Sequence, residues 1–79
     1  MYQKSIGDTA GELWKALGAK GDVTVSALPK LLGKEAALVQ QATGWLAREH
    51  KVEFDKQGKI LIIRLTPSEA AAFKAQNGR

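Results

Sequence analysis

The sequence predicts one small α+β domain in which helices come first and a β-hairpin follows. Apolar residues recur every three or four positions through the first half of the chain, which is the period of amphipathic helices. Two stretches with strand-like composition, residues 52–54 and 60–65, then flank a turn that contains Gly58, as in a hairpin. A chain of 79 residues has room for one such domain. We therefore expect residues 1–79 to form a single domain with its core in residues 5–65.

The first helix is expected from Ile6 to Leu17, where one apolar stripe consists of Ile6, Ala10, Leu13, Trp14 and Leu17. Gly18 and Gly21 are expected to end it. Gly7 and Gly11 weaken it by up to ~1 kcal/mol each relative to alanine. Residues this small also permit the close approach of another backbone.

A short strand and two further helices should follow. The strand is expected in residues 22–25, which are bounded by Gly21 and Ser26. Ser26 is a favourable N-cap for a second helix, and Gly33 would end that helix. Its apolar face would be Leu28, Leu31 and Leu32, with Pro29 in the first turn. The third helix should run from Lys34 or Glu35 to Glu49, with an apolar face of Leu38, Val39, Ala42, Trp45 and Leu46.

The end of the chain predicts a hairpin and one more helix. In the returning strand, Leu61, Ile63 and Leu65 fall on one face, and Ile60, Ile62 and Arg64 fall on the other. Thr66 is the expected N-cap of a helix over residues 67–76, with Pro67 at its first position and Glu69 reaching back as a capping box. Three helices, a short first strand and a β-hairpin wing are the outline of a winged helix-turn-helix, here with an extra C-terminal helix.

Two stretches of the chain resemble a small bacterial family of winged helix-turn-helix domains of unknown function. The first is residues 6–17, and the second is the run Gly44-Trp45-Leu46-Ala47-Arg48-Glu49, followed by residues 51–54. The resemblance covers about residues 5–65. It implies the fold and a link to DNA, and it brings no established activity with it.

The composition argues against several classes of function. The chain has no cysteine and one histidine, His50, so a Cys-based metal site is excluded and a metal or catalytic role of His50 is not expected. No phosphate-binding loop, nucleophile elbow or paired-acid pattern occurs. We expect a non-enzymatic protein with no cofactor and no small-molecule ligand. No apolar run reaches the roughly 18 residues of a membrane span, and the N-terminal residues do not resemble a signal peptide, so a cytoplasmic protein is expected.

The net charge of +4 suits an anionic partner, and duplex DNA is the candidate. In a winged helix the third helix enters the major groove and the wing contacts the flanking DNA. The groove-facing candidates are Gln40, Gln41, Thr43 and Arg48, because glutamine can read adenine and arginine can read guanine. The candidates for phosphate contacts are Lys34, Lys51, Lys56 and Lys59. The alternative is that these residues form the ordinary solvated side of a helix and a loop.

A homodimer is the second expected assembly. Ile60 and Ile62 need a cover, and Gly44 is a costly residue inside a helix unless a partner backbone approaches it. The dimer-interface candidates are Gly44, Ile60, Ile62, Ala72 and Phe73. The alternatives are that the C-terminal helix covers the strand within the same chain, and that Gly44 packs against the first helix. Both tryptophans, Trp14 and Trp45, are expected in the core.

Two functions therefore remain open from the sequence. One is a DNA-binding, transcription-associated module that acts as a dimer through the third helix and the wing. The other is a protein–protein interaction module that keeps the winged-helix fold without binding DNA. The single arginine within the predicted third helix, Arg48, favours the second.

Overall fold

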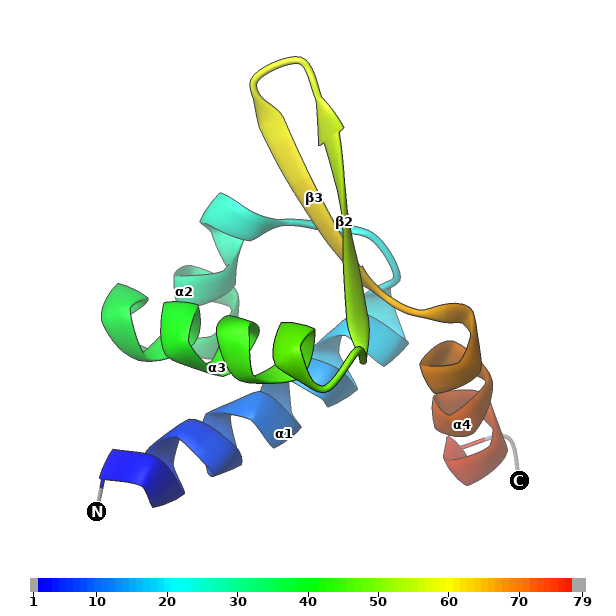
Figure 1. Cartoon of the computed structure of the whole chain (residues 1–79), viewed down its shortest axis with the longest axis horizontal. Helices are drawn as coiled ribbons and strands as arrows, with labels where there is room; N and C mark the ends of the chain where they lie inside the picture. The colour runs from blue at the N-terminus through cyan, green and yellow to red at the C-terminus, as the bar shows by residue number, and fades with distance from the viewer. Residues whose placement is uncertain (1, 78–79) are drawn as a thin grey trace.

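The computed structural model describes residues 2–77 and confirms the predicted α+β class and order of elements. The elements are α1 (Tyr2–Lys20), β1 (Val23–Thr24), the 3₁₀ turn η1 (Val25–Ala27), α2 (Leu28–Leu32), α3 (Ala36–Arg48), β2 (Val52–Gln57), β3 (Ile60–Leu65) and α4 (Pro67–Asn77). In Figure 1 the hairpin of β2 and β3 rises away from the three N-terminal helices, and α4 lies on the opposite side from the tip of the hairpin.

The sheet is antiparallel, with β3 in the middle and the order β1-β3-β2. Its register pairs Val52 with Leu65 at the base of the hairpin and Gln57 with Ile60 at the far end. Gly58 turns the chain between the strands with a φ of 63°, a conformation that favours glycine. Strand β1 pairs only with Ile62 and Ile63 in the middle of β3, so the end of the hairpin beyond them extends from the domain as a wing.

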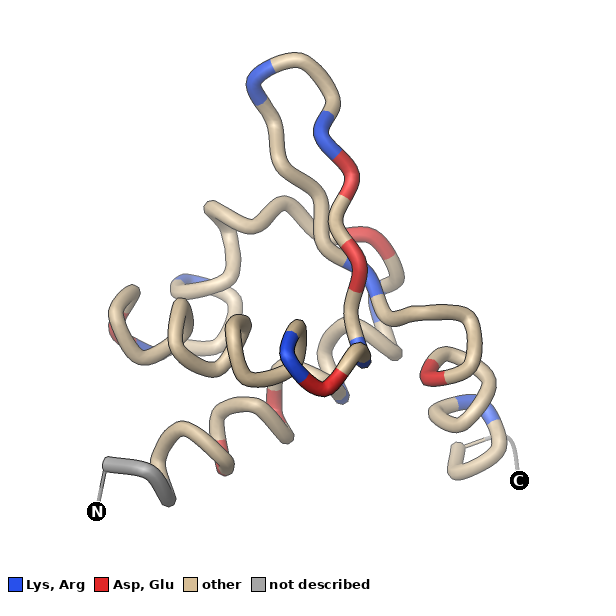
Figure 2. The backbone as a smooth tube through the Cα atoms, in the orientation of Figure 1, with Lys and Arg blue, Asp and Glu red and all other residues tan. Residues whose placement is uncertain are grey.

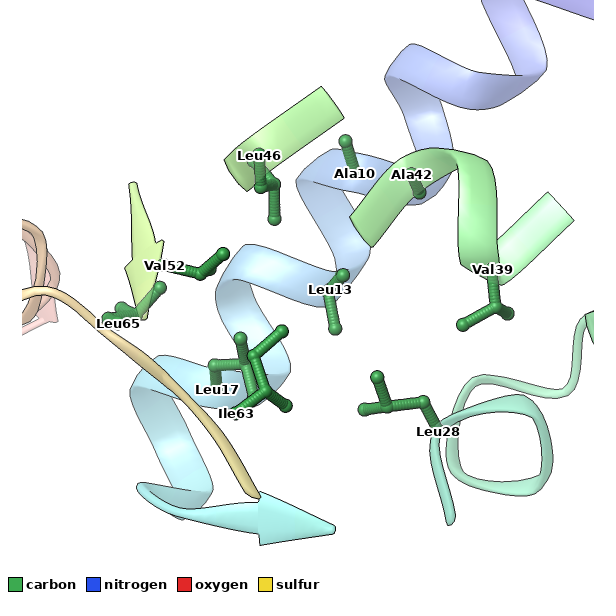
Figure 3. Close-up of a cluster of buried hydrophobic side chains, with 10 residues drawn as sticks. All are labelled: Ala10, Leu13, Leu17, Leu28, Val39, Ala42, Leu46, Val52, Ile63 and Leu65. Carbon is green, nitrogen blue, oxygen red and sulfur yellow. The ribbon is translucent and has the colours of Figure 1, made fainter. Parts of the chain in front are cut away.

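The core lies between α1, α3 and the inner half of the sheet. Figure 3 shows Leu13 and Leu17 of α1 pointing toward Ile63 of β3 and Leu28 of α2. The buried apolar residues are Ala10, Leu13, Leu17, Leu28, Val39, Ala42, Leu46, Val52, Ile63 and Leu65. They match the inward positions that the periodicity predicts in α1, α3 and β3.

The first helix is longer than the sequence predicts, and Gly18 does not end it. Helix α1 continues to Lys20, and the chain leaves it at Gly21, whose φ is 82°. The prediction for Gly18 was wrong because this glycine serves packing. A β-carbon at Gly18 would clash with the ring of Phe73 from α4.

The second helix begins differently from the prediction. A turn of 3₁₀ helix at Val25–Ala27 precedes α2, so Ala27 rather than Ser26 occupies the N-cap, and no side chain caps the helix. Gly33 ends α2 as predicted, with a φ of 66°. Of the expected apolar face, Leu28 is buried, Leu32 packs partly against the core, and Leu31 is exposed.

The prediction that Trp45 lies in the core was wrong. Its side chain is 47 % exposed, because the buried stripe of α3 runs through Val39, Ala42 and Leu46, and Trp45 lies beside that stripe. Helix α3 stops before His50, which takes a left-handed φ of 59° and donates its backbone N–H to the carbonyl of Ala47. A histidine thus occupies a position where glycine is the usual residue.

Helix α4 folds back onto α1. The Trp14 indole N–H donates to Oε1 of Glu69 at 2.8 Å, and the Trp14 and Phe73 rings meet edge to face with centroids 5.6 Å apart. The expected cap is not formed, since the Thr66 hydroxyl has no hydrogen-bond partner and Glu69 bonds to Trp14 instead. Trp14 is half-buried rather than fully in the core, and a carboxylate satisfies its indole N–H.

Candidate nucleic-acid interface

The outward side of α3 carries the candidates for base contacts. Gln40, Gln41 and Arg48 are exposed. Thr43 is half-buried, and its hydroxyl donates to the carbonyl of Val39 at 2.7 Å, which leaves only its acceptor capacity for a ligand. This side of α3 therefore offers two free amides and one guanidinium.

The candidate phosphate contacts divide into two groups. Lys56 and Lys59 lie near the tip of the wing, are exposed, and form no ion pair within residues 2–77. Figure 2 shows these basic segments at the end of the hairpin and the acidic segments nearer its base. Lys34 instead lies 3.7 Å from a carboxylate oxygen of Glu12, and Lys51 is half-buried at the base of β2. The structure thus keeps the two wing lysines free and engages Lys34 within the chain.

Arg64 holds the base of the wing together, a role that the sequence pattern did not reveal. Its guanidinium donates to both carboxylate oxygens of Asp22, at 2.9 and 3.0 Å. It also contacts Asp55 at 3.4 Å and Glu53 at 3.6 Å. Hydrogen bonding to Arg64 lowers the pKa of Asp22 from its ordinary value, and the same bond raises the pKa of Arg64.

These contacts offset only part of the acidic charge at the base of the wing. Glu53 and Asp55 belong to the wing and would repel a phosphate backbone. Arg64 lies 3.6 and 3.4 Å from them, but it is also paired with Asp22, so one positive charge is shared by three carboxylates. The base of the wing therefore keeps a net negative charge, and the positive charge of the wing lies at its tip.

A groove of about 630 Å³ lies between α3 and the wing. Gln40 and Thr43 line its helical wall, and Phe54, Lys59 and Leu61 line its wing wall. Phe54 is 42 % and Leu61 is 41 % exposed, so the groove presents large apolar side chains to solvent. Leu61 shares a strand face with the buried Ile63 and Leu65, but the core ends before this part of the wing.

The candidate dimer residues lie on separate surfaces. Gly44 is exposed on α3 and a β-carbon there would meet no atom within 4 Å, so the alternative that it packs against α1 is wrong. Ile60 is 51 % exposed and Ile62 is half-buried. Phe73 packs on Trp14 and Gly18 within the chain, so α4 closes part of its own apolar surface. Ala72 of the same helix is half-buried.

Within residues 2–77, no helix is long and apolar enough to cross a membrane. The same part of the chain holds no group of three or more histidine, cysteine, aspartate or glutamate residues that could bind a metal ion. The surface chemistry that is present consists of amides, basic groups and apolar side chains around α3 and the wing.

The chain belongs to the winged helix-turn-helix domain family DUF2582, whose model matches residues 1–65. It is 40 % identical over 63 residues to the uncharacterized protein MJ1608 of Methanocaldococcus jannaschii, covering 76 % of this chain and 89 % of that one. The identification agrees with the resemblance that the sequence suggested, and residues 66–79 lie outside the match.

Solved structures with this fold include larger proteins. Lactococcus lactis ZitR superimposes with a TM-score of 0.79 at 14 % identity, over 98 % of this chain and 60 % of that one. The adhesin competence repressor AdcR of Streptococcus pyogenes gives a TM-score of 0.68 at 18 % identity, over 89 % of this chain and 56 % of that one. At these identities the likeness establishes the winged-helix fold alone, and the chain spans little more than half of either protein.

Proposed function

We propose that this protein binds duplex DNA as a small, non-enzymatic, regulator-like module, with α3 in the major groove and the wing tip on the flanking backbone. The observation that carries the proposal is that Gln40 of α3 and Lys59 of the wing line the same groove. One partner can therefore contact the amides of the helix and the free lysines of the wing together. The name of one structural neighbour, a repressor, supports a transcription-associated role.

The division of labour follows from the chemistry of the side chains. Lys56 and Lys59 would add affinity that falls as salt rises, because each neutralised phosphate releases counterions. Gln40, Gln41 and Arg48 would contribute the contacts that depend on base sequence. Gln41 and Arg48 lie on the outward side of α3, away from Leu46, so base contacts need no rearrangement of the core.

The test is a titration of the purified protein with a random-sequence duplex at several salt concentrations. Arg48→Ala and Lys56→Ala should each weaken binding, and loss of one phosphate contact should reduce the slope of log K against log salt by about 0.9. Lys74→Ala is the matched control, because Lys74 is an exposed lysine of α4, remote from the wing. The proposal fails if the parent protein does not bind DNA at low salt, or if Lys74→Ala weakens binding as much as Lys56→Ala does.

A protein-interaction module is the second candidate, and the exposed apolar groove favours it. Phe54 and Leu61 would face a phosphate backbone in a DNA complex, which offers them no apolar contact. Leu61→Lys separates the two functions, since a new positive charge should strengthen DNA binding and should abolish the docking of an apolar protein segment. The exposed side of α3 is also rich in small residues, namely Ala36, Ala37 and Gly44.

We also propose that the protein acts as a homodimer, because a domain with this small a core commonly gains stability from assembly. A dimer would present two copies of α3 to two half-sites of a duplex. One candidate interface is the surface named from the sequence, with Gly44, Ile60 and Ile62, and an interface on another surface of the domain is its alternative. Gly44→Glu and Ile62→Asp are the variants that would break an interface built on them.

A further inference from the structure

One stripe along α1 is composed mostly of glycine. Gly7, Gly11, Trp14 and Gly18 follow one another at spacings of four, three and four residues, so they lie on the same side of the helix. At Gly18 the reason for glycine is visible, since the Phe73 ring occupies the space where a side chain would be. At Gly7 and Gly11 a β-carbon would meet no atom within 4 Å. Another backbone could therefore pack closely against Gly7 and Gly11, and no other part of the single chain does so.

The open half of the stripe, Gly7 and Gly11, forms the floor of a groove of about 460 Å³ between α1, the end of α3 and α4. Its walls include Trp45 of α3 and Ala72 and Gln76 of α4, and its floor includes Gly7, Gly11 and Trp14. Trp45 is 47 % exposed, a large apolar area to leave in water for a residue at the edge of the core. The groove combines a flat backbone surface with the indole of Trp45, and its lining also includes the charged residues Lys15, Lys51 and Glu69. A flat backbone beside a bulky side chain suits another helix.

The charges on α1 indicate which helix would fit. Asp8 and Lys15 are exposed beside the stripe and form no ion pair within residues 2–77. They are seven residues apart, about two helical turns, and Gly11 lies between them, three residues from Asp8 and four from Lys15. When two copies of α1 cross in antiparallel orientation between Gly11 and Glu12, Asp8 of each copy comes opposite Lys15 of the other. A surface that is complementary to itself in this way is what an interface with two-fold symmetry requires.

We infer that α1 of a second copy of this chain docks in this groove, with the two helices crossing between Gly11 and Glu12 and with Trp45 of each copy covering the partner's α1. The interface lies on a different surface from Ile60, Ile62 and Gly44, because the groove is bounded by α1, α4 and the opposite edge of α3. Gln40 and Thr43, which line the groove beside the wing, stay free in this dimer. The inference deepens the proposed homodimer and is independent of whether the protein binds DNA.

The test measures the solution mass by sedimentation equilibrium over a range of protein concentrations, without DNA. Gly11→Leu should raise the dimer dissociation constant by about 30-fold, the change expected when one central, well-packed position is disrupted. The fold of the single chain should tolerate this substitution, since no atom lies near the new side chain and leucine favours helix more than glycine does. Gly44→Leu is the matched control, a second exposed helical glycine with open space around it, and it should leave the dimer intact.

The charge pair gives a second, independent readout. Asp8→Lys should weaken the dimer by about tenfold, because two lysines of one copy would then face two of the other. Exchanging both charges, with Asp8→Lys and Lys15→Asp together, should restore the dimer. The inference is overturned if the parent protein stays monomeric up to millimolar concentration, if Gly11→Leu leaves the dimer intact, if Gly44→Leu dissociates it as much as Gly11→Leu does, or if the double exchange fails to recover what the single change loses.

Discussion

The two ends of α1 carry the same glycine-rich stripe, but only one end is covered. At the C-terminal end, Phe73 of α4 lies directly on Gly18, and Trp14 is held by Glu69. At the N-terminal end, Gly7 and Gly11 face an open groove with the exposed Trp45 at its side. The covered end shows how such a stripe can act in packing. The Phe73 ring contacts the backbone of α1 there because Gly18 has no side chain.

The comparison also shows that a glycine in a helix has no fixed meaning in the sequence. Gly18 was expected to end α1 and instead receives Phe73, whereas the chain turns three residues later at Gly21. Helix propensity is equal at Gly7, Gly11 and Gly18 of α1, so only the tertiary partner distinguishes them. Substitutions at the covered and the open end of α1 should therefore have different effects on the stability of the chain.

Gly18→Leu should lower the free energy of unfolding by about 3 kcal/mol, because the new side chain displaces Phe73 and overpacks the contact between α1 and α4. Urea denaturation followed by circular dichroism measures the change. Gly11→Leu is the control, with the same chemistry on the same stripe, and it should not destabilise the dilute, monomeric protein. Equal destabilisation by both substitutions would mean that the two ends do not differ as the structure indicates.

Phe73→Ala should cost about 2 kcal/mol, less than for a fully buried phenylalanine because this side chain is half-buried. The informative measurement is the double variant with Gly18→Leu. Once the ring is absent, leucine at position 18 has room. The double variant should therefore lose clearly less unfolding free energy than the sum of the losses in the two single variants. Strict additivity would show that Phe73 and Gly18 do not share one contact.

Glu69→Leu should cost about 1 kcal/mol through loss of the hydrogen bond from the Trp14 indole, since both groups are only partly buried. Glu69→Gln is the matched control, because its amide oxygen can accept the same bond. Near-ultraviolet circular dichroism should report a loosened Trp14 in the leucine variant only. A glutamine variant that loses as much stability as the leucine variant would assign the effect to charge rather than to this bond.

The regular pattern of apolar residues predicted most of the fold. The inward residues of α1, α3 and β3 could be identified because helices and strands have fixed periods, and Pro67 and Gly33 marked the boundaries by their backbone preferences. The prediction was weaker where two elements compete for one side chain. Glu69 could cap α4 or accept from Trp14, and only the position of α1 decides between them.

The candidate site was predictable in its polar part and not in its apolar part. Exposed side chains such as Gln41 and Arg48 follow from the helical period alone. The groove beside Phe54 and Leu61 depends on how far the wing stands from α3, which no local pattern encodes. The prediction that Trp45 is buried was wrong for a related reason, since a residue at the border of the apolar stripe is buried only if a neighbouring element covers it.

Gly7→Ala gives the smallest and most discriminating effect at the open end. In the dilute protein it should raise the free energy of unfolding by about 0.5 kcal/mol, because alanine favours the helix and the methyl group meets no other atom. The thermal midpoint measured at low concentration would rise accordingly. At high concentration the sign should reverse, since the methyl group separates two backbones that pack closely in the dimer. A substitution that stabilises the chain and weakens its assembly would show that the glycine serves the partner rather than the fold. If Gly7→Ala stabilises the protein equally at every protein concentration, the dimer partner does not pack against Gly7.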